Sequence, residues 1–311
     1  MRSKGNPNAE VQKRYAHEAV SLPSLKKVRI DPVCEFGETS YGIVKRVEVF
    51  SKWIDDFTTR EGRQTVSVLD YGCGTGDHIT FPLAKSGHDV LGVDIHGPSI
   101  LEARRRYTLP NLTFRVGELK DLMDEGLSFD FIVCSEVLEH LHNPEEFLRG
   151  LRSLLRPGGG LIITTPNGFG SFEMLCRLER LLRRIGVHHG LRRLYEKGRQ
   201  LSRRAQGDQV VSPPSERLSG GMEVGFLNKD SIHVQFFRLR TLERLFSESG
   251  FRVVARRART LLCGPYVDVA FRLLPWRQAL LRLNNRLADL LPITWAADWM
   301  FLLEPKEGVQ P

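Results

Sequence analysis

A short apolar run that stops at an acid and then meets three glycines at alternate positions is the feature that most constrains this chain. The segment from Val66 to Gly76 reads VSVLDYGCGTG, so Asp70 precedes Gly72, Gly74 and the last glycine. Residues without a Cβ at this density predict a tight turn after a buried strand, where a ligand can approach the backbone. We therefore expect a ligand at the end of this strand. The alternative is a glycine-rich turn that binds nothing.

The spacing of the glycines excludes two common nucleotide-binding turns. The dinucleotide fingerprint GxGxxG requires glycine at position 77, where this chain has Asp77. No Gly-Lys-Ser/Thr follows the turn, which excludes the phosphate-binding P-loop. Asp70 would repel a pyrophosphate but suits the positive amino end of a ligand such as S-adenosylmethionine (SAM). The turn therefore favours SAM over a nucleotide phosphate.

Short apolar runs then alternate with segments of helical spacing up to Thr165. The apolar runs read SVLDY, DVLGVD, LTFRV, FDFIVCS and GLIITT. This alternation predicts βαβ units and a parallel sheet that is covered on both faces. The clearest helix starts after the N-cap Asn143, with Pro144 in its first position, Glu146 completing a capping box, and an end at Pro157 and Gly158.

The rest of the chain predicts two insertions into the same sheet. We divide the 311 residues into four parts: an N-terminal segment with a cap helix at 1–60, a ligand-binding core at 61–169, a basic helical insertion at 170–230, and a C-terminal part at 231–311. The C-terminal part contains a second helical insertion at about 262–294, followed by a last strand in ADWMFLLEP.

Charge and cysteine content narrow the class of protein. The net charge is +8, and between Ser171 and Gln206 ten arginines and lysines stand against three glutamates. The five cysteines are scattered and never paired as CxxC, which speaks against a disulfide scaffold and a cysteine zinc site and favours a reducing compartment. No stretch is apolar enough for a signal peptide or a membrane span. We expect a cytoplasmic protein, with peripheral contact to a membrane as an open alternative.

A family resemblance extends the glycine turn over most of the core. LDYGCGTGDH, GVDIHGPSI, FRVGELKDL, FDFIVCSEVLEHLHNPEEFL and LRPGGGLIITTPN follow one another in this order. In order and spacing they resemble the class I SAM-dependent methyltransferase superfamily, and they look most like its ubiquinone-biosynthesis-type O-methyltransferase branch. The resemblance implies an α/β fold with a Rossmann-like seven-stranded sheet of order 3-2-1-4-5-7-6, its last strand antiparallel, and SAM as the cofactor.

The resemblance also implies residues that contact SAM. Asp70 and the three glycines would bind the methionine moiety. Asp94, which ends the second strand 18 residues after Gly76, would accept hydrogen bonds from the ribose hydroxyls. Glu118 stands where the family usually has an aspartate facing the adenine amine. The remaining expected contacts are Cys73, Ile95, Leu119 and Ser135.

The end of the fourth strand carries a second group of polar residues. In CSEVLEHLHN, Glu136, Glu139 and His140 stand at i, i+3 and i+4, so a helix would place them on one face. With His233 they could hold Mg²⁺, Mn²⁺, Fe²⁺ or Zn²⁺. The set resembles the metal site of small-RNA 2′-O-methyltransferases. In the metal-free alternative, the same residues line a polar pocket.

Methyl transfer from SAM is an in-line displacement, and it needs a general base only when the nucleophile carries a proton. His140 or His233 could be that base for a hydroxyl. No Asn/Asp-Pro-Pro-Tyr/Phe signature of amine methylation is present, and TTPN at 164–167 is not that motif because it follows the fifth strand. We therefore expect O-methylation of a small acceptor, lipophilic or sugar-containing. An RNA 2′-O-methyltransferase and a non-catalytic SAM-binding subunit remain alternatives.

The basic insertion has two interpretations. Leu175, Leu178, Leu181, Leu182 and Ile185 form an apolar stripe among arginines. Such a helix can lie on an anionic membrane or hold a lipid-linked substrate, or it can be a solvated lid that packs on the domain. RNA is a less favoured partner, because the basic region has few aromatic residues. The sequence does not indicate an oligomeric state.

Overall fold

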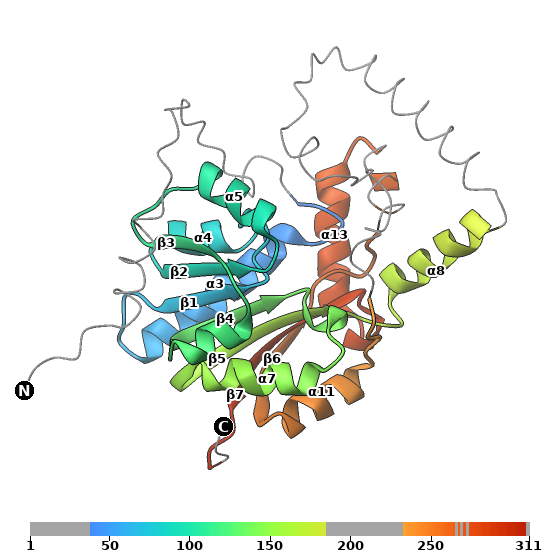
Figure 1. Cartoon of the computed structure of the whole chain (residues 1–311). Helices are drawn as coiled ribbons and strands as arrows, with labels where there is room; N and C mark the ends of the chain where they lie inside the picture. The colour runs from blue at the N-terminus through green and yellow to red at the C-terminus, as the bar shows by residue number, and fades with distance from the viewer. Residues whose placement is uncertain (1–37, 185–232, 265–266, 268–269, 272–273, 309–311) are drawn as a thin grey trace, which may run out of the picture.

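The computed structural model of the chain describes residues 38–184 and 233–308, except 265–266, 268–269 and 272–273 (Figure 1). One seven-stranded sheet has the order β3-β2-β1-β4-β5-β7-β6. Its strands are β1 (Ser67–Tyr71), β2 (Asp89–Asp94), β3 (Leu112–Val116), β4 (Phe129–Ser135), β5 (Leu155–Pro166), β6 (Phe251–Ala258) and β7 (Asp298–Pro305). The first five strands pair in parallel, and β7 runs antiparallel between β5 and β6. The expected sheet order and its antiparallel last strand are confirmed.

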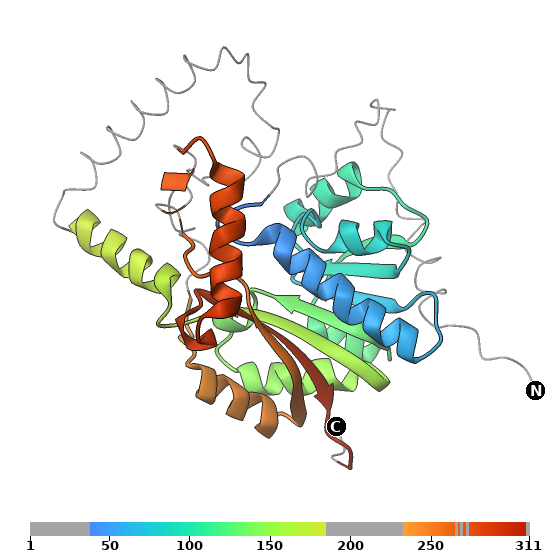
Figure 2. The same ribbon diagram turned by 180° about the vertical axis from the view of Figure 1, so that it is seen from behind.

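Helices cover both faces of this sheet, as the front and back views show (Figures 1 and 2). On one face α3 (Ile43–Arg60) and α4 (Thr80–Lys85) share a buried cluster with Val133 of β4. The other face carries α6 (Leu119–Asp124), α7 (Pro144–Ser153) and α11 (Leu239–Glu248), whose cluster includes Ile132. Because Ile132 and Val133 are adjacent and both 0% exposed, the strand is buried on both sides. Helix α5 (Gly97–Arg106) packs against β3.

The helix after Asn143 differs from expectation at both of its ends. The Asn143 side chain accepts from the Glu146 backbone N–H at 3.5 Å, but the Glu146 carboxylate contacts the Asn143 side-chain amide at 2.7 Å instead of the backbone. The helix ends at Ser153 rather than at Pro157, and Leu155 already pairs with Phe129 as the first residue of β5. Leu155 therefore pairs with β4 in the sheet, although its apolar spacing also fits a longer helix.

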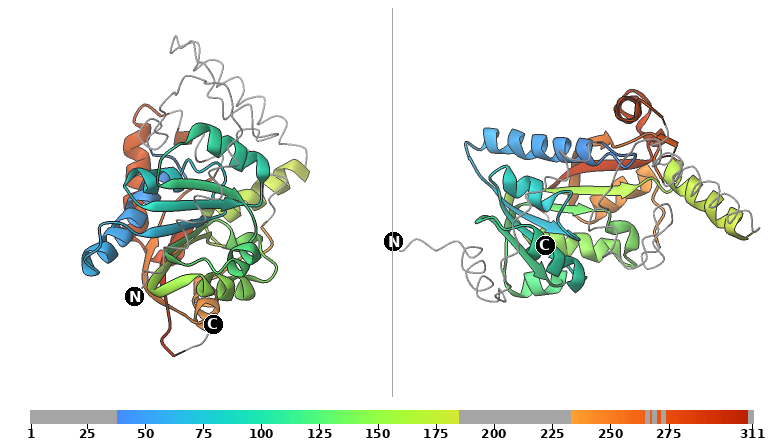
Figure 3. Two further views of the ribbon diagram at one scale, coloured as in Figure 1. Left: turned by 60° about the vertical axis from the view of Figure 1, so that its left-hand side comes forward. Right: turned by 90° about the horizontal axis from the view of Figure 1, so that it is seen from above.

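Two helices lie at the end of the sheet where β5 ends and β7 begins (Figure 3). Helix α8 (Ser171–Arg184) follows β5, and α13 (Arg277–Leu290) with the short helix η2 (Ile293–Trp295) precedes β7. Pro166 at the end of β5 pairs with Asp298 at the start of β7. The segment that contains α8 therefore leaves the sheet at the place where the segment that contains α13 returns to it. Most of the expected 170–230 insertion lies outside the described residues, and its boundaries stay a prediction. None of the described helices is long and apolar enough to cross a bilayer.

Candidate active site

The glycine turn after β1 has the backbone that its sequence predicts. Gly72, Gly74 and Gly76 have φ values of 78°, 55° and 75°, a region that side chains with a Cβ rarely adopt. A Cβ would meet Val137 at 2.4 Å from the first glycine and Phe114 at 2.5 Å from the third, but from Gly74 it meets nothing within 4 Å. The first and third glycines therefore serve packing, and the second borders open space.

Asp94 fixes this turn from the neighbouring strand. Its Oδ2 accepts the Gly74 backbone N–H at 2.8 Å, and its Oδ1 accepts the His96 N–H at 2.8 Å. An ionised carboxylate has about four lone-pair positions, so these two bonds orient Asp94 and leave acceptor capacity for two further hydroxyls. This geometry suits the expected contact with ribose.

Replacing Asp94 by alanine should weaken the binding of S-adenosylhomocysteine (SAH) by roughly 10- to 100-fold, the loss of charge-assisted hydrogen bonds. Asp89, which is exposed at the start of the same strand, provides the matched control Asp89→Ala. Isothermal titration calorimetry on both variants measures the difference. Equal affinities in two folded variants would remove Asp94 from the cofactor site.

Asp70 lies behind the turn rather than on the surface. It is 2% exposed, and its Oδ2 accepts from the Thr80 hydroxyl at 2.6 Å. Burial raises the pKa of Asp70 to about 6, although the Thr80 hydrogen bond and the nearby Arg46 act in the opposite direction. The carboxyl group therefore ionises near pH 6, and a positive charge beside it would favour the ionised form.

This raised pKa predicts a pH dependence of cofactor binding. A ligand ammonium favours ionised Asp70, so SAH affinity should rise as the pH increases through about 6 and level off above it. For the chain without ligand we expect the opposite trend in the free energy of unfolding: the stability that protonated Asp70 contributes below its ordinary pKa of 3.8 should be lost as the pH rises through about 6. The variant Asp70→Asn should show neither change. Calorimetric titrations at several pH values provide the measurement, and an identical pH slope in the variant would contradict the assignment.

Fewer contacts in the structure indicate where the adenine ring of SAM would lie. Glu118 is exposed and precedes α6, where its backbone N–H donates to Asp121 at 2.8 Å. The Leu119 N–H donates to the Tyr71 hydroxyl at 3.1 Å. Ile95 follows Asp94 and is 70% exposed, an apolar surface that a flat ring can cover. The adenine contacts of these residues stay predictions.

A buried charged network, which the sequence analysis did not find, lies beside the glycine turn. Arg46 of α3 donates to the Ser135 hydroxyl at 2.9 Å, and Arg259 donates to Asp298 at 2.5 Å and to Glu136 at 3.1 Å. Both arginines are less than 9% exposed, and each has a buried Nε without a partner among the described residues. One signal was available in the sequence: Arg46 lies on the stripe of α3 that is otherwise apolar. Ser135 thus contacts α3, and its cofactor contact stays a prediction.

Glu136 belongs to this network and not to a helical face with Glu139 and His140. Its φ is 57°, the only positive value among the described non-glycine residues, and only Leu138–His140 forms a short 3-10 turn. The expected helical face is therefore wrong, because the backbone reverses at Glu136. Its carboxylate accepts from Thr164 at 2.5 Å and from Arg259. Burial tends to raise the pKa of Glu136, but the two arginines outweigh it and lower the pKa.

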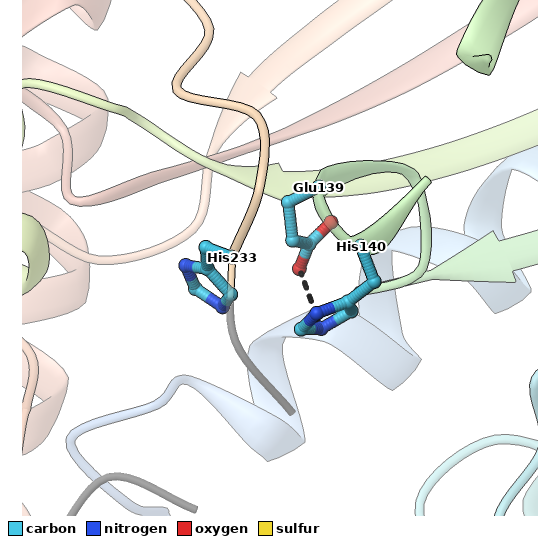
Figure 4. Close-up of side chains that lie close together, drawn as sticks. All are labelled: Glu139, His140 and His233. Atoms are coloured by element: carbon cyan, nitrogen blue, oxygen red, sulfur yellow. Dashed lines mark ion pairs between the residues drawn. The ribbon is translucent and has the colours of Figure 1, made fainter. Parts of the chain in front are cut away.

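Glu139, His140 and His233 do come together, as Figure 4 shows. One ligand atom from each lies within 4.8 Å of the others. Glu139 Oε1 lies 3.9 Å from His140 Nε2, and the two imidazole centroids are 4.9 Å apart. The backbone holds His233 in place, since the N–H groups of Val234 and Gln235 both donate to the Glu139 carbonyl, at 2.9 and 3.0 Å. These backbone hydrogen bonds therefore bring His233, which follows the basic insertion in the chain, to Glu139 and His140.

The carboxyl groups in this cluster have unusual environments. Glu139 is 1% exposed, and burial together with the nearby Glu136 raises its pKa well above its ordinary value. Its Oε1 is buried without a hydrogen-bond partner among the described residues, a costly state that a proton or a cation would relieve. The Glu173 carboxylate of α8, itself 3% exposed, accepts from His233 Nδ1 at 2.6 Å and so orients that ring. The donor set of one carboxylate and two imidazoles fits a divalent metal.

The comparison with protein families now defines the class. The profile of the methyltransferase domain family matches residues 43–256, more than half of the chain. The chain therefore belongs to this family, and its sheet order is that of a class I SAM-dependent methyltransferase.

Part of the chain is similar to two ubiquinone biosynthesis O-methyltransferases. The chain is 36% identical over 108 residues to the mitochondrial ubiquinone biosynthesis O-methyltransferase of Rattus norvegicus, covering 33% of this chain and 31% of the relative. It is 36% identical over 104 residues to the ubiquinone biosynthesis O-methyltransferase of Xanthomonas axonopodis pv. citri, covering 32% and 43%. The matches thus span less than half the length of these two relatives.

Two solved structures are similar to this chain at low sequence identity. The magnesium protoporphyrin IX methyltransferase of Synechocystis with bound SAH is 16% identical with a TM-score of 0.45, over 96% of this chain and 94% of that one. PKMT2 of Rickettsia typhi is 14% identical with a TM-score of 0.49, over 79% and 50%.

Proposed function

We propose that this chain transfers a methyl group from SAM to a hydroxyl of a small acceptor that is lipophilic or carries a sugar. The observation that carries the proposal is the pair of histidines, His140 and His233, which lie together with two buried glutamates where β4 ends beside the glycine turn of β1. A hydroxyl keeps its proton at neutral pH, so its methylation requires a nearby base, whereas a neutral amine does not. The O-methyltransferase names of the relatives support the same reaction.

Different residues would bind SAM and accept the proton of the acceptor. The glycine turn and Asp94 would hold SAM so that its methyl carbon faces the acceptor. The acceptor oxygen attacks that carbon, the carbon–sulfur bond breaks, and SAH leaves with the electron pair. The hydroxyl proton passes to one imidazole. Glu173, which lies 2.6 Å from His233 Nδ1, would orient that ring, and Glu139 lies 3.9 Å from His140.

We also propose that Glu139, His140 and His233 can hold a divalent cation. The unpartnered buried Oε1 of Glu139 and the spacing of the three ligand atoms support it. A cation bound there would supply Lewis-acid chemistry by lowering the pKa of a coordinated hydroxyl. Glu136 is not part of this set, because Arg259 and Thr164 hold its carboxylate.

A matched pair of acceptors tests the O-methylation. Catechol and ortho-phenylenediamine have the same ring and differ only in hydroxyl against amine. With SAM present, we expect catechol to gain one methylene in mass and SAH to accumulate, and the diamine to stay unmodified. Methylation of the diamine alone would contradict a hydroxyl acceptor. Methylation of added RNA in place of catechol would favour the nucleic-acid alternative.

A further inference from the structure

The outward face of α13 exposes a continuous apolar stripe. Leu283, Leu287 and Leu290 stand at i, i+4 and i+7, and their exposed fractions are 50%, 36% and 80%. Trp276 precedes the helix and is 74% exposed, and Trp295 of η2 is 62% exposed. These five residues are called here the α13 stripe. Exposure of so many large apolar side chains to water is unfavourable and is typical of an interaction surface.

The packing of α13 fixes this orientation. Its inner side buries Leu281, Asn284, Asn285 and Ala288, and the Asn285 side chain donates to Glu38 at 2.8 Å. Lys45 of α3 pairs with Asp289 at 2.9 Å, with its side chain 12% exposed. These contacts fix the inner side of the helix, so Leu283, Leu287 and Leu290 lie on its outer side.

Charge around the stripe selects the partner. Arg282 and Arg286 are exposed on one flank, and α13 carries three arginines against a single aspartate. Two copies of this face would bring like charges together, whereas an anionic lipid surface would complement them. Tryptophan rings prefer the boundary between lipid and water, and a helix of 14 residues is too short to span a bilayer but can lie in its surface. We propose that the α13 stripe docks on an anionic lipid bilayer.

Helix α8 extends from the same end of the sheet (Figure 3), and it also carries a row of exposed apolar side chains. Its Met174, Leu178 and Leu181 also stand at i, i+4 and i+7, and their exposed fractions are 62%, 46% and 54%. The same helix carries Glu173, which contacts His233. Docking at this end would bring the site to a lipophilic acceptor within the bilayer. This purpose rests on the proposed function, whereas the docking itself does not.

Vesicle co-sedimentation tests the docking. With the full chain, we expect binding to vesicles of equal parts phosphatidylcholine and phosphatidylglycerol, weak binding to pure phosphatidylcholine, and release as salt increases. The double variant Leu283→Gln and Leu287→Gln should lower the partition coefficient by roughly tenfold or more. Leu101→Gln is the matched control, since Leu101 is 58% exposed on α5.

Tryptophan fluorescence provides an independent reading. Of the four tryptophans, Trp53 and Trp299 are 8% and 1% exposed, so only Trp276 and Trp295 can change environment on docking. Anionic vesicles should shift the emission to shorter wavelength and make it accessible to brominated lipid. Trp276→Phe with Trp295→Phe should remove both effects.

The outcomes separate this inference from the proposed function. Unchanged vesicle binding in the leucine double variant would overturn it, and so would a dimer in light scattering that dissociates in that variant. SAH titration reports the cofactor site in every variant. A chain that binds SAH and methylates catechol but ignores anionic vesicles would refute the docking alone.

Discussion

Replacing Gly74 by valine should abolish detectable cofactor binding while the chain stays folded. A Cβ at this position meets no protein atom within 4 Å, so the valine side chain would project into the open space where the cofactor is expected. The φ of 55° adds about 1–2 kcal/mol of strain, which a domain of this size tolerates. We expect SAH affinity to fall by at least about 100-fold, or about 2.8 kcal/mol. Calorimetry measures the affinity, and thermal unfolding reports the fold.

Gly62 provides a control with the same strain. Its φ is 62° and a Cβ there also meets nothing within 4 Å, but it lies in the turn after α3. Gly62→Val should therefore lose a similar amount of stability and keep its SAH affinity. If both valine variants bound SAH like the parent chain, the open space over Gly74 would not be the cofactor site.

His140→Ala and His233→Ala should each lower kcat by on the order of 10²- to 10⁴-fold, because either a general base or a metal ligand is lost. SAH affinity should stay nearly unchanged, since neither histidine is among the expected cofactor contacts. His142→Ala is the matched control, because His142 is exposed two residues beyond the 3-10 turn. Initial rates with catechol and saturating SAM provide the measurement.

A chelator separates the two roles of the histidines. If the cluster holds a cation, EDTA should remove activity, Mg²⁺ or Mn²⁺ should restore it, and Glu139→Gln should abolish this response. If the histidines act as bases without metal, EDTA should have no effect while the histidine variants remain slow. Full activity after chelation and in both histidine variants would show that the acceptor side of the site is misassigned.

The sequence by itself determined the sheet and the cofactor turn. The strands from β1 to β4 lie where the apolar runs predict them, because strands buried on both faces need unbroken apolar residues. The three glycines identify the turn, since its positive φ angles and close contacts are properties of the backbone itself. Both signals are local, and local spacing therefore suffices to detect them.

The tertiary structure alone decided which polar residues meet. Glu136 has helical spacing to His140, yet bonds with Thr164 and Arg259 stabilise a left-handed backbone that turns it away. Arg259 lies 123 residues from Glu136 in the chain, and no periodicity in either segment indicates that pairing. His233 reaches His140 because the returning chain bonds to the Glu139 carbonyl. Such contacts depend on long-range packing. A buried charge is costly unless it is paired, and its partner can come from any part of the chain that the fold brings close.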